Sequence, residues 1–271
     1  MKKAFRVITV VGVICLAAGI VISAIGFGIG LLTNKNEKTE NFSKVITGNV
    51  EKIEIEINAG QLNIKKGSEF KVVAEDFPEN TLKYECESGK LKIKEENKKW
   101  FGISYGMMGW NARTPVLTVY ITEGMSFEDV SIDVGAGAAD INYIKADKLK
   151  IQGGAGRISG EYLTAADCEI SAGAGEVSLK NIDFSKSELS TGTGRLAVSG
   201  KITGATKLNN GIGEIEVTIS GNKSDYYIKA QNGIGKISVN GKRYDKDDYN
   251  SGAQNTIDAS NGIGAINIYI E

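Results

Sequence analysis

Few residues in this sequence could carry chemistry, and their types exclude several reaction classes. The chain of 271 residues contains no histidine and three cysteines, Cys15, Cys86 and Cys168. Histidine is the usual general base and a frequent metal ligand, so Ser-His-Asp, Cys-His and His-zinc sites are excluded. Three cysteines without framework spacing also argue against a fold built on disulfides.

The acidic residues offer one cluster, Asp245, Asp247 and Asp248, in the segment 240–255. A glycosidase needs two carboxyl groups at a fixed separation, which a single loop does not supply. A solvated loop is the simpler interpretation, and a sugar or cation site is the alternative. The glycine-rich stretches elsewhere precede strand-like sequence, so they are not nucleotide-binding loops. We expect no enzymatic activity, no catalytic residues, no cofactor and no metal.

The most unusual stretch, residues 100–110, contains both tryptophans and two of the four methionines. Three glycines within it argue against a regular helix or strand. Two interpretations stay open. In the first, the stretch is buried, because large exposed apolar patches are uncommon. In the second, it is a docking loop for a partner or the membrane interface. The candidate binding residues are Trp100, Phe101, Tyr105, Met107, Met108 and Trp110.

Composition and charge narrow the class of protein further. Lys and Arg number 32 against 33 Asp and Glu, which gives a net charge of −1. Without a basic excess, we expect no nucleic-acid partner. Glycine is abundant at 34 residues, yet only 2 residues are proline and 41% are hydrophobic, so the chain is predicted to fold.

The N-terminus has the pattern of a membrane anchor. Residues 1–6 carry three basic side chains, and the uncharged run 7–32 follows them. A bilayer core needs about 20 apolar helical residues, whereas the apolar region of a cleaved signal peptide has about 7–15. We therefore expect an uncleaved signal anchor in the cell membrane. The basic flank predicts a single-pass protein with a cytoplasmic N-terminus and an extracytoplasmic body.

Small residues lie on one helical face of this predicted span. Close approach of two membrane helices uses such a face, which predicts a homo-oligomer. Glycine is also common in membrane helices without any such role, so both interpretations remain. The four small residues are Gly19, Ser23, Gly26 and Gly30.

The second half of the chain is an internal repeat. Gly-x-Gly occurs seven times, and the second glycines of successive copies are 19, 19, 19, 19, 22 and 29 residues apart. Hydrophobic and polar residues alternate on both sides of each copy, which is typical of two short strands. Such a small unit cannot close its own core. The copies are therefore predicted to stack in chain order as parallel coils of an all-β, single-stranded β-solenoid.

When the copies are aligned, the residues at one equivalent position form a column, and three such columns support this stacking. The glycines are expected at corners where the backbone needs positive φ and close approach. The asparagines 210, 232 and 261 are expected to form an amide ladder. A column of alternating charge is expected to hold the coils in register. That column reads Arg157, Glu176, Arg195, Glu214 and Lys236.

The region before the repeats lacks the 19-residue period. Residues 52–65 resemble one degenerate coil, and the strand-like segments after them predict a larger β-cap that covers the first end of the solenoid. The predicted organisation is a cytoplasmic N-terminus 1–6, a transmembrane anchor 7–32, a linker 33–41, the first coil and β-cap 42–129, and the solenoid 130–271.

The order of these features resembles the bacterial "putative adhesin" family of unknown function. A basic start, one span, a first coil at 53–64, a hairpin region and repeated Gly-x-Gly-polar-Ile-x-Val carry the likeness over residues 42–271. The resemblance implies a surface-displayed β-solenoid that binds an unknown protein or cell-envelope ligand. Some relatives lie beside envelope-stress signalling components. The resemblance therefore also implies an alternative function, that of an accessory or sensor protein in envelope-stress signalling that acts through a membrane partner.

Overall fold

The fold is all-β, as the sequence predicts. The computed structural model describes residues 38–96, 114–244 and 252–271. These residues form strands and one short 3-10 helix, η2 (Lys223–Asp225). The predicted membrane span 7–32 lies outside the described residues. Within the described ranges, no helix combines the length and the hydropathy needed to cross a bilayer.

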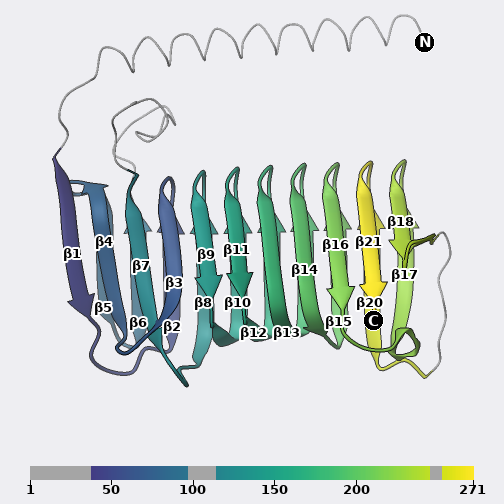
Figure 1. The fold of residues 1–271 in the computed structure, drawn as a ribbon, viewed down its shortest axis with the longest axis horizontal. Helices are drawn as coiled ribbons and strands as arrows, with labels where there is room; N and C mark the ends of the chain where they lie inside the picture. The colour runs from purple at the N-terminus through teal and green to yellow at the C-terminus, as the bar shows by residue number, and fades with distance from the viewer. Residues whose placement is uncertain (1–37, 97–113, 245–251) are drawn as a thin grey trace, which may run out of the picture.

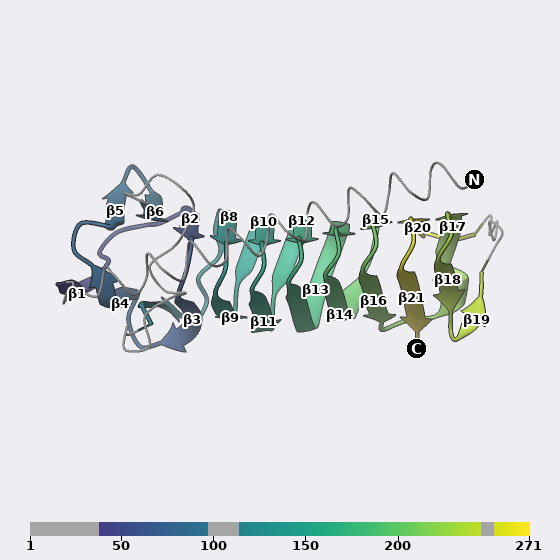
Figure 2. The same cartoon turned by 90° about the horizontal axis from the view of Figure 1, so that it is seen from above.

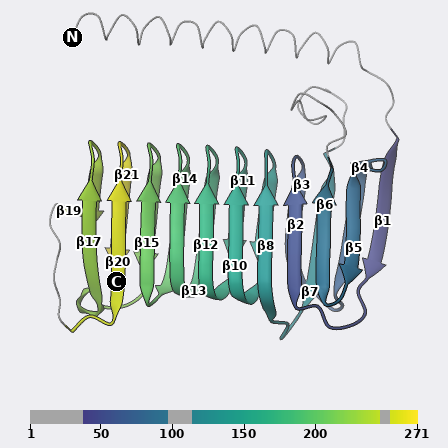
Figure 3. The same cartoon turned by 180° about the vertical axis from the view of Figure 1, so that it is seen from behind.

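The strands lie in two rows with the hydrophobic core between them (Figure 1), and Figure 2 shows both rows from above. The first row is clearest from behind (Figure 3). From the cap to the far end of the rod, its strands are β5 (Leu82–Glu87), β6 (Lys90–Glu95), β2 (Lys52–Ile57), β8 (Phe127–Val134), β10 (Lys145–Gly153), β12 (Thr164–Ala172), part of β13 (Glu176–Thr191), β15 (Ala205–Asn210), β20 (Asn255–Asn261) and β17 (Tyr226–Asn232).

The second row runs alongside the first. In the same direction, its strands are β1 (Thr39–Val45), β4 (Lys71–Pro78), β7 (Val116–Thr122), β3 (Gln61–Gly67), β9 (Ala138–Asn142), β11 (Arg157–Glu161), part of β13, β14 (Arg195–Ile202), β16 (Glu214–Ile219), β21 (Ala265–Ile270), β18 (Lys236–Val239) and β19 (Lys242–Arg243). Pairing is parallel between coils and antiparallel at the ends, for example between β1 and β4.

The parallel register joins residues one repeat apart. Ile151 pairs with Ile170, which pairs with Leu189 on the next coil. In the opposite row, Ile158 pairs with Val177 in the same way. All five side chains are buried. Burying one such side chain contributes about 1.5–3 kcal/mol, so the stacked columns supply the core that a single coil lacks.

The Gly-x-Gly corners bring backbone against backbone. A Cβ built on Gly156, Gly175 or Gly194 would lie 1.9, 2.1 and 2.1 Å from the carbonyl oxygen of the matching glycine one coil earlier. These distances leave no room for a side chain. The expectation of positive φ was wrong for these corners, because the glycines with positive φ in the described residues lie elsewhere. Close approach alone explains the glycines.

The predicted asparagine ladder is confirmed, with an unexpected order. Asn210 Nδ2 donates to Asn261 Oδ1 at 2.6 Å, and Asn261 Nδ2 donates to Asn232 Oδ1 at 2.9 Å. The asparagine of the last copy therefore lies between those of the fifth and sixth copies. Each hydrogen bond also satisfies a polar group near the buried corner.

The prediction that all coils stack in chain order was therefore wrong at the C-terminal end. Strands β20 and β21 lie between β15/β16 and β17/β18, where the yellow strands mark them in Figure 1. The repeat spacings of 22 and 29 residues are longer than the usual 19. The extra residues let the chain pass over one coil position and then return to fill it. As a result, Lys236 pairs with Ala265 rather than with Glu214, and the alternating charge column ends one coil early.

The N-terminal end has the same arrangement. Strands β2 and β3, which form the first coil in sequence, lie between β6/β7 and β8/β9. The first and the last coil of the chain are thus each paired on both sides. Because unpaired chain ends fray and invite further strand pairing, this arrangement protects the first and the last coil of the chain, while β17 and β18 stand at the far end of the rod.

We expect Gly175→Val to destabilise the protein far more than Glu176→Ala. Valine would place a Cβ against the Gly156 carbonyl oxygen, and overpacking of this kind costs about 3 kcal/mol. Glu176 contributes one exposed ion pair, with its carboxylate 3.1 Å from Arg157 Nη2. Such pairs contribute at most about 1 kcal/mol. Thermal unfolding measures both variants, and equal losses in Tm would contradict the corner geometry.

Deletion of residues 255–271, which form the last coil, should also detach the sixth repeat from the rod. Strands β17 and β18 have β20 and β21 as their parallel partners, so the truncation removes the ladder on that side. We expect residues 226–244 to become sensitive to limited proteolysis, read by mass spectrometry. Tyr269→Thr is the control, because it keeps the coil and matches Thr218 in the same row. Unchanged protection of 226–244 would contradict the inserted position of the last coil.

Candidate functional site

Residues 100–110 and the acidic cluster at 245, 247 and 248 lie outside the described residues. Among the described residues, no group of three or more Cys, Asp and Glu side chains could hold a metal. Cys168 is buried, and burial raises the pKa of its thiol, so it is a core residue rather than a nucleophile.

The described surface instead presents a pair of stacked tyrosines. Tyr143 lies in the turn between β9 and β10, and Tyr162 lies in the equivalent turn between β11 and β12. Their ring centroids are 5.1 Å apart and their planes differ by 8°. The side chains are 48% and 50% exposed, although a tyrosine usually buries most of its ring.

The backbone under these tyrosines is unusual. Tyr143 has φ of 62° and Tyr162 has φ of 59°, while Asn181 has φ of 52° at the matching position of the next coil. Asparagine adopts this left-handed region readily, whereas a bulky aromatic residue is disfavoured there. A sparsely populated conformation costs of order 1 kcal/mol, and such residues cluster at functional sites. The cost and the exposure together suggest that these rings serve binding rather than folding.

A shallow polar recess adjoins the tyrosine pair. It holds about 460 Å³ and lies on the outward face of β9, β11 and β13. The side chains that line it are almost all able to form hydrogen bonds. They are Asp140, Asn142, Tyr143, Ser159, Glu161, Tyr162, Ser178 and Lys180. We call this surface the tyrosine recess.

Part of the hydrogen-bonding capacity of the tyrosine recess is used internally. Asn142 Oδ1 accepts from the backbone N–H of Glu161 at 3.0 Å, and Ser159 Oγ donates to Asp140 Oδ1 at 3.4 Å. The Glu161 carboxylate and the Lys180 ammonium form no ion pair with any residue that the structure describes. These two groups remain available to a ligand.

Sequence reasoning missed this site, although a signal was present. Tyr143 and Tyr162 are 19 residues apart, which is the repeat length, so the coil alignment puts them in one column. The neighbouring column member is Asn181, and an aromatic pair in an otherwise polar turn stands out once the copies are aligned.

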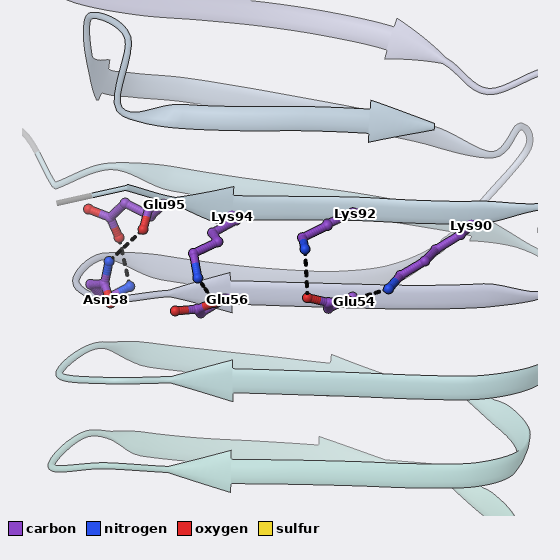
Figure 4. A network of polar contacts seen from close by, with 7 residues as sticks. All are labelled: Glu54, Glu56, Asn58, Lys90, Lys92, Lys94 and Glu95. Atoms are coloured by element: carbon purple, nitrogen blue, oxygen red, sulfur yellow. Dashed lines mark hydrogen bonds and ion pairs between the residues drawn. The ribbon is translucent and has the colours of Figure 1, made fainter. Parts of the chain in front are cut away.

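A second polar cluster, between β2 and β6, is fully paired (Figure 4). Glu54 accepts from Lys90 and lies 3.3 Å from Lys92 Nζ, while Glu56 lies 2.6 Å from Lys94 Nζ. The hydrogen bond from Lys90 lowers the pKa of Glu54. Because each of these charges already has a partner, the cluster joins the cap to the first coil and leaves little for a ligand.

Glu95 closes the outer side of the first coil. Its Oε2 accepts from the backbone N–H groups of Asn58 at 2.7 Å and Ala59 at 3.1 Å. In the later coils these corner N–H groups donate to carbonyls of the preceding corner, as Gly154 does to Val134. The carboxylate takes the place of those carbonyls. Burial raises the pKa of Glu95, although the two backbone hydrogen bonds act in the opposite direction.

Comparison with known proteins agrees with this architecture. Residues 50–262 match the family described as Toastrack DUF4097, which is most of the chain. The protein belongs to the Toastrack family. The match covers both the inserted first coil and the repeats through the corner of the last coil. Among curated proteins, no sequence matches this Toastrack chain.

Solved structures similar to this Toastrack protein share little sequence with it. A "putative adhesin" from Bacteroides fragilis is 15% identical, with 85% of this chain and 97% of that chain covered and a TM-score of 0.48. A "putative cell adhesion protein" from Clostridium sporogenes is 17% identical, with 86% and 100% covered and a TM-score of 0.38. A "putative adhesin" from Parabacteroides distasonis is 12% identical, with 87% and 98% covered and a TM-score of 0.47.

Glu95 should make the stability of this Toastrack domain depend on pH. The folded protein holds the Glu95 proton more tightly than the unfolded chain does. Stability that is present at low pH is therefore lost as pH rises from the usual pKa of 4.5 through the raised value. Glu95→Gln keeps an acceptor for both N–H groups but does not ionise. We expect the Tm of the variant to gain on that of the wild type as the pH rises above 4.5.

Circular dichroism melts of both proteins across that pH range measure this effect. Glu96→Gln is the matched control, because Glu96 is the exposed neighbour of Glu95. A difference in Tm between the wild type and Glu95→Gln that stays constant with pH would contradict the assigned role.

Proposed function

We propose that this protein is a membrane-anchored, extracytoplasmic binding module, adhesin-like and without enzymatic activity. The observation that carries the proposal is the tyrosine recess. Two exposed aromatic rings are held at a backbone cost on a rigid solenoid, beside charged groups that have no internal partner among the described residues. Exposed aromatic side chains of this kind commonly anchor partners.

The solenoid suits such a role because it presents its surface rigidly. The coils are joined along both rows by continuous parallel ladders, and the corners are fixed by backbone contacts. A preformed surface loses little conformational entropy on binding. The names of the similar solved structures, which call those proteins adhesins or adhesion proteins, are in keeping with a binding role.

The anchor and the aromatic stretch complete the proposal. The uncharged run 7–32 would hold the protein in the membrane, and the basic residues before it would keep the N-terminus in the cytoplasm. The stretch 100–110 would add a second contact surface through Trp100 and Trp110, because tryptophan favours interfaces.

Cells that produce the full chain test this function. We expect them to be retained on surfaces coated with cell-wall sacculi or mucin several-fold better than cells that produce residues 1–41 alone. Protease added outside intact cells should remove the body and abolish retention. A Trp100→Ser, Trp110→Ser variant should be retained less well, with its Tm nearly unchanged if the loop is exposed.

Two outcomes would contradict the proposal. Retention equal to that of the cells with residues 1–41 on every coated surface would remove the binding role. Complete protection of the body from external protease would overturn the orientation. Binding that is found only when the span is intact, and never with residues 33–271, would instead favour a signalling role through a membrane partner.

A further inference from the structure

We infer that the tyrosine recess binds a polysaccharide chain, one sugar ring of which packs on Tyr162 while neighbouring sugars reach the polar side chains of β9, β11 and β13. This inference rests on the proposed binding function and names its ligand class. Three independent features of the site carry it: the aromatic stack, the chemistry of the lining and the repeat of that lining from coil to coil.

The aromatic stack offers a platform for a sugar ring. The apolar C–H face of a pyranose packs on an aromatic face, while the hydroxyl groups at its rim stay hydrogen-bonded. The stack ends at Asn181, the smaller residue at the matching position of the next coil. The outer face of Tyr162 is therefore not covered by a third ring. Tyrosine also gives a large contact area at a low cost in side-chain entropy.

The lining fits hydroxyl groups better than it fits a protein or an ion. Protein anchors enter apolar, fully desolvated pockets, whereas this recess has no aliphatic side chain in its lining. An anion would meet Asp140 and Glu161, and a cation would meet Lys180. Hydroxyl groups can donate to the two carboxylates and accept from the ammonium, so a neutral or weakly charged glycan satisfies both signs at once.

The repeat favours a polymer over a single sugar. Two outward rows cross the recess along the rod, one formed by Asn142, Glu161 and Lys180 and the other by Asp140, Ser159 and Ser178. Successive members of a row are one coil apart, about 4.8 Å. This spacing is close to the length of one pyranose unit. The recess is shallow and open on the surface, as a chain that continues past the site requires.

Oligosaccharides of cellulose, chitin, xylan and mannan, together with peptidoglycan glycan strands, are the probes. Their binding to the purified full chain in detergent is measured by affinity electrophoresis and tyrosine fluorescence. The test variant is Tyr143→Asn with Tyr162→Asn, because Asn181 shows that asparagine is accommodated in this turn. The control is Tyr269→Thr, an exposed tyrosine on β21. Lys180→Ser is a second, independent variant on an exposed side chain that forms no ion pair with the described residues.

We expect at least one glycan to bind, with longer chains binding more tightly than short ones. The double tyrosine variant should bind about tenfold more weakly or worse, Lys180→Ser should bind a few-fold more weakly, and the control should bind as the wild type does. A melt of each variant checks that it is folded, and if the double variant unfolds, Lys180→Ser decides.

Three results would overturn the inference. They are no binding to any probe, binding that all tyrosine and lysine variants retain, or binding of immobilised fibronectin through the recess in place of glycans. The cell-retention assay separates this failure from failure of the proposed function. If cells with the double variant are retained as well as wild-type cells, the protein is a binding module whose surface lies elsewhere.

Discussion

The close stacking of backbone on backbone at the glycine corners is the constraint on which the structure depends. A Cβ on Gly264 would lie 1.7 Å from the carbonyl oxygen of Gly213, and one on Gly213 would lie 2.0 Å from that of Gly194. No side chain fits at these distances. Because glycine has none, each coil can turn directly above the preceding one. The parallel ladders set the coil spacing, the glycines let the corners keep it, and this spacing brings the hydrophobic columns into contact.

The ends of the rod are built differently from its middle. A coil at either end has a strand edge without a parallel partner, and open edges invite pairing with other chains. The chain avoids leaving its first and last coils there, because β2/β3 and β20/β21 are each inserted between two others. At the cap, Glu95 also replaces the missing corner carbonyls for Asn58 and Ala59. Closure at this end comes from a buried side chain as well as from topology.

The proposed binding surface is a by-product of the repeat that the fold needs. A residue placed at one position of each coil becomes a row on the surface, and two tyrosines at one such position become a stacked pair. The turn beneath them is suited to asparagine, as at Asn181, so the tyrosines add surface chemistry at the expense of backbone stability. A regular scaffold can carry a binding site in this way without a deep pocket.

The sequence by itself determined the all-β class, the 19-residue register, the glycine corners and the asparagine ladder, because each depends on a local pattern repeated at a constant spacing. It did not determine the order of the coils. Copies with the same hydrophobic columns can stack in more than one order, and only the tertiary structure places Asn261 between Asn210 and Asn232. The tyrosine recess, too, is formed only by the tertiary structure. Its side chains come from three successive coils. The exposure and stacking of the two tyrosines, and the absence of an ion pair for Glu161 and Lys180 among the described residues, exist only once those coils are packed.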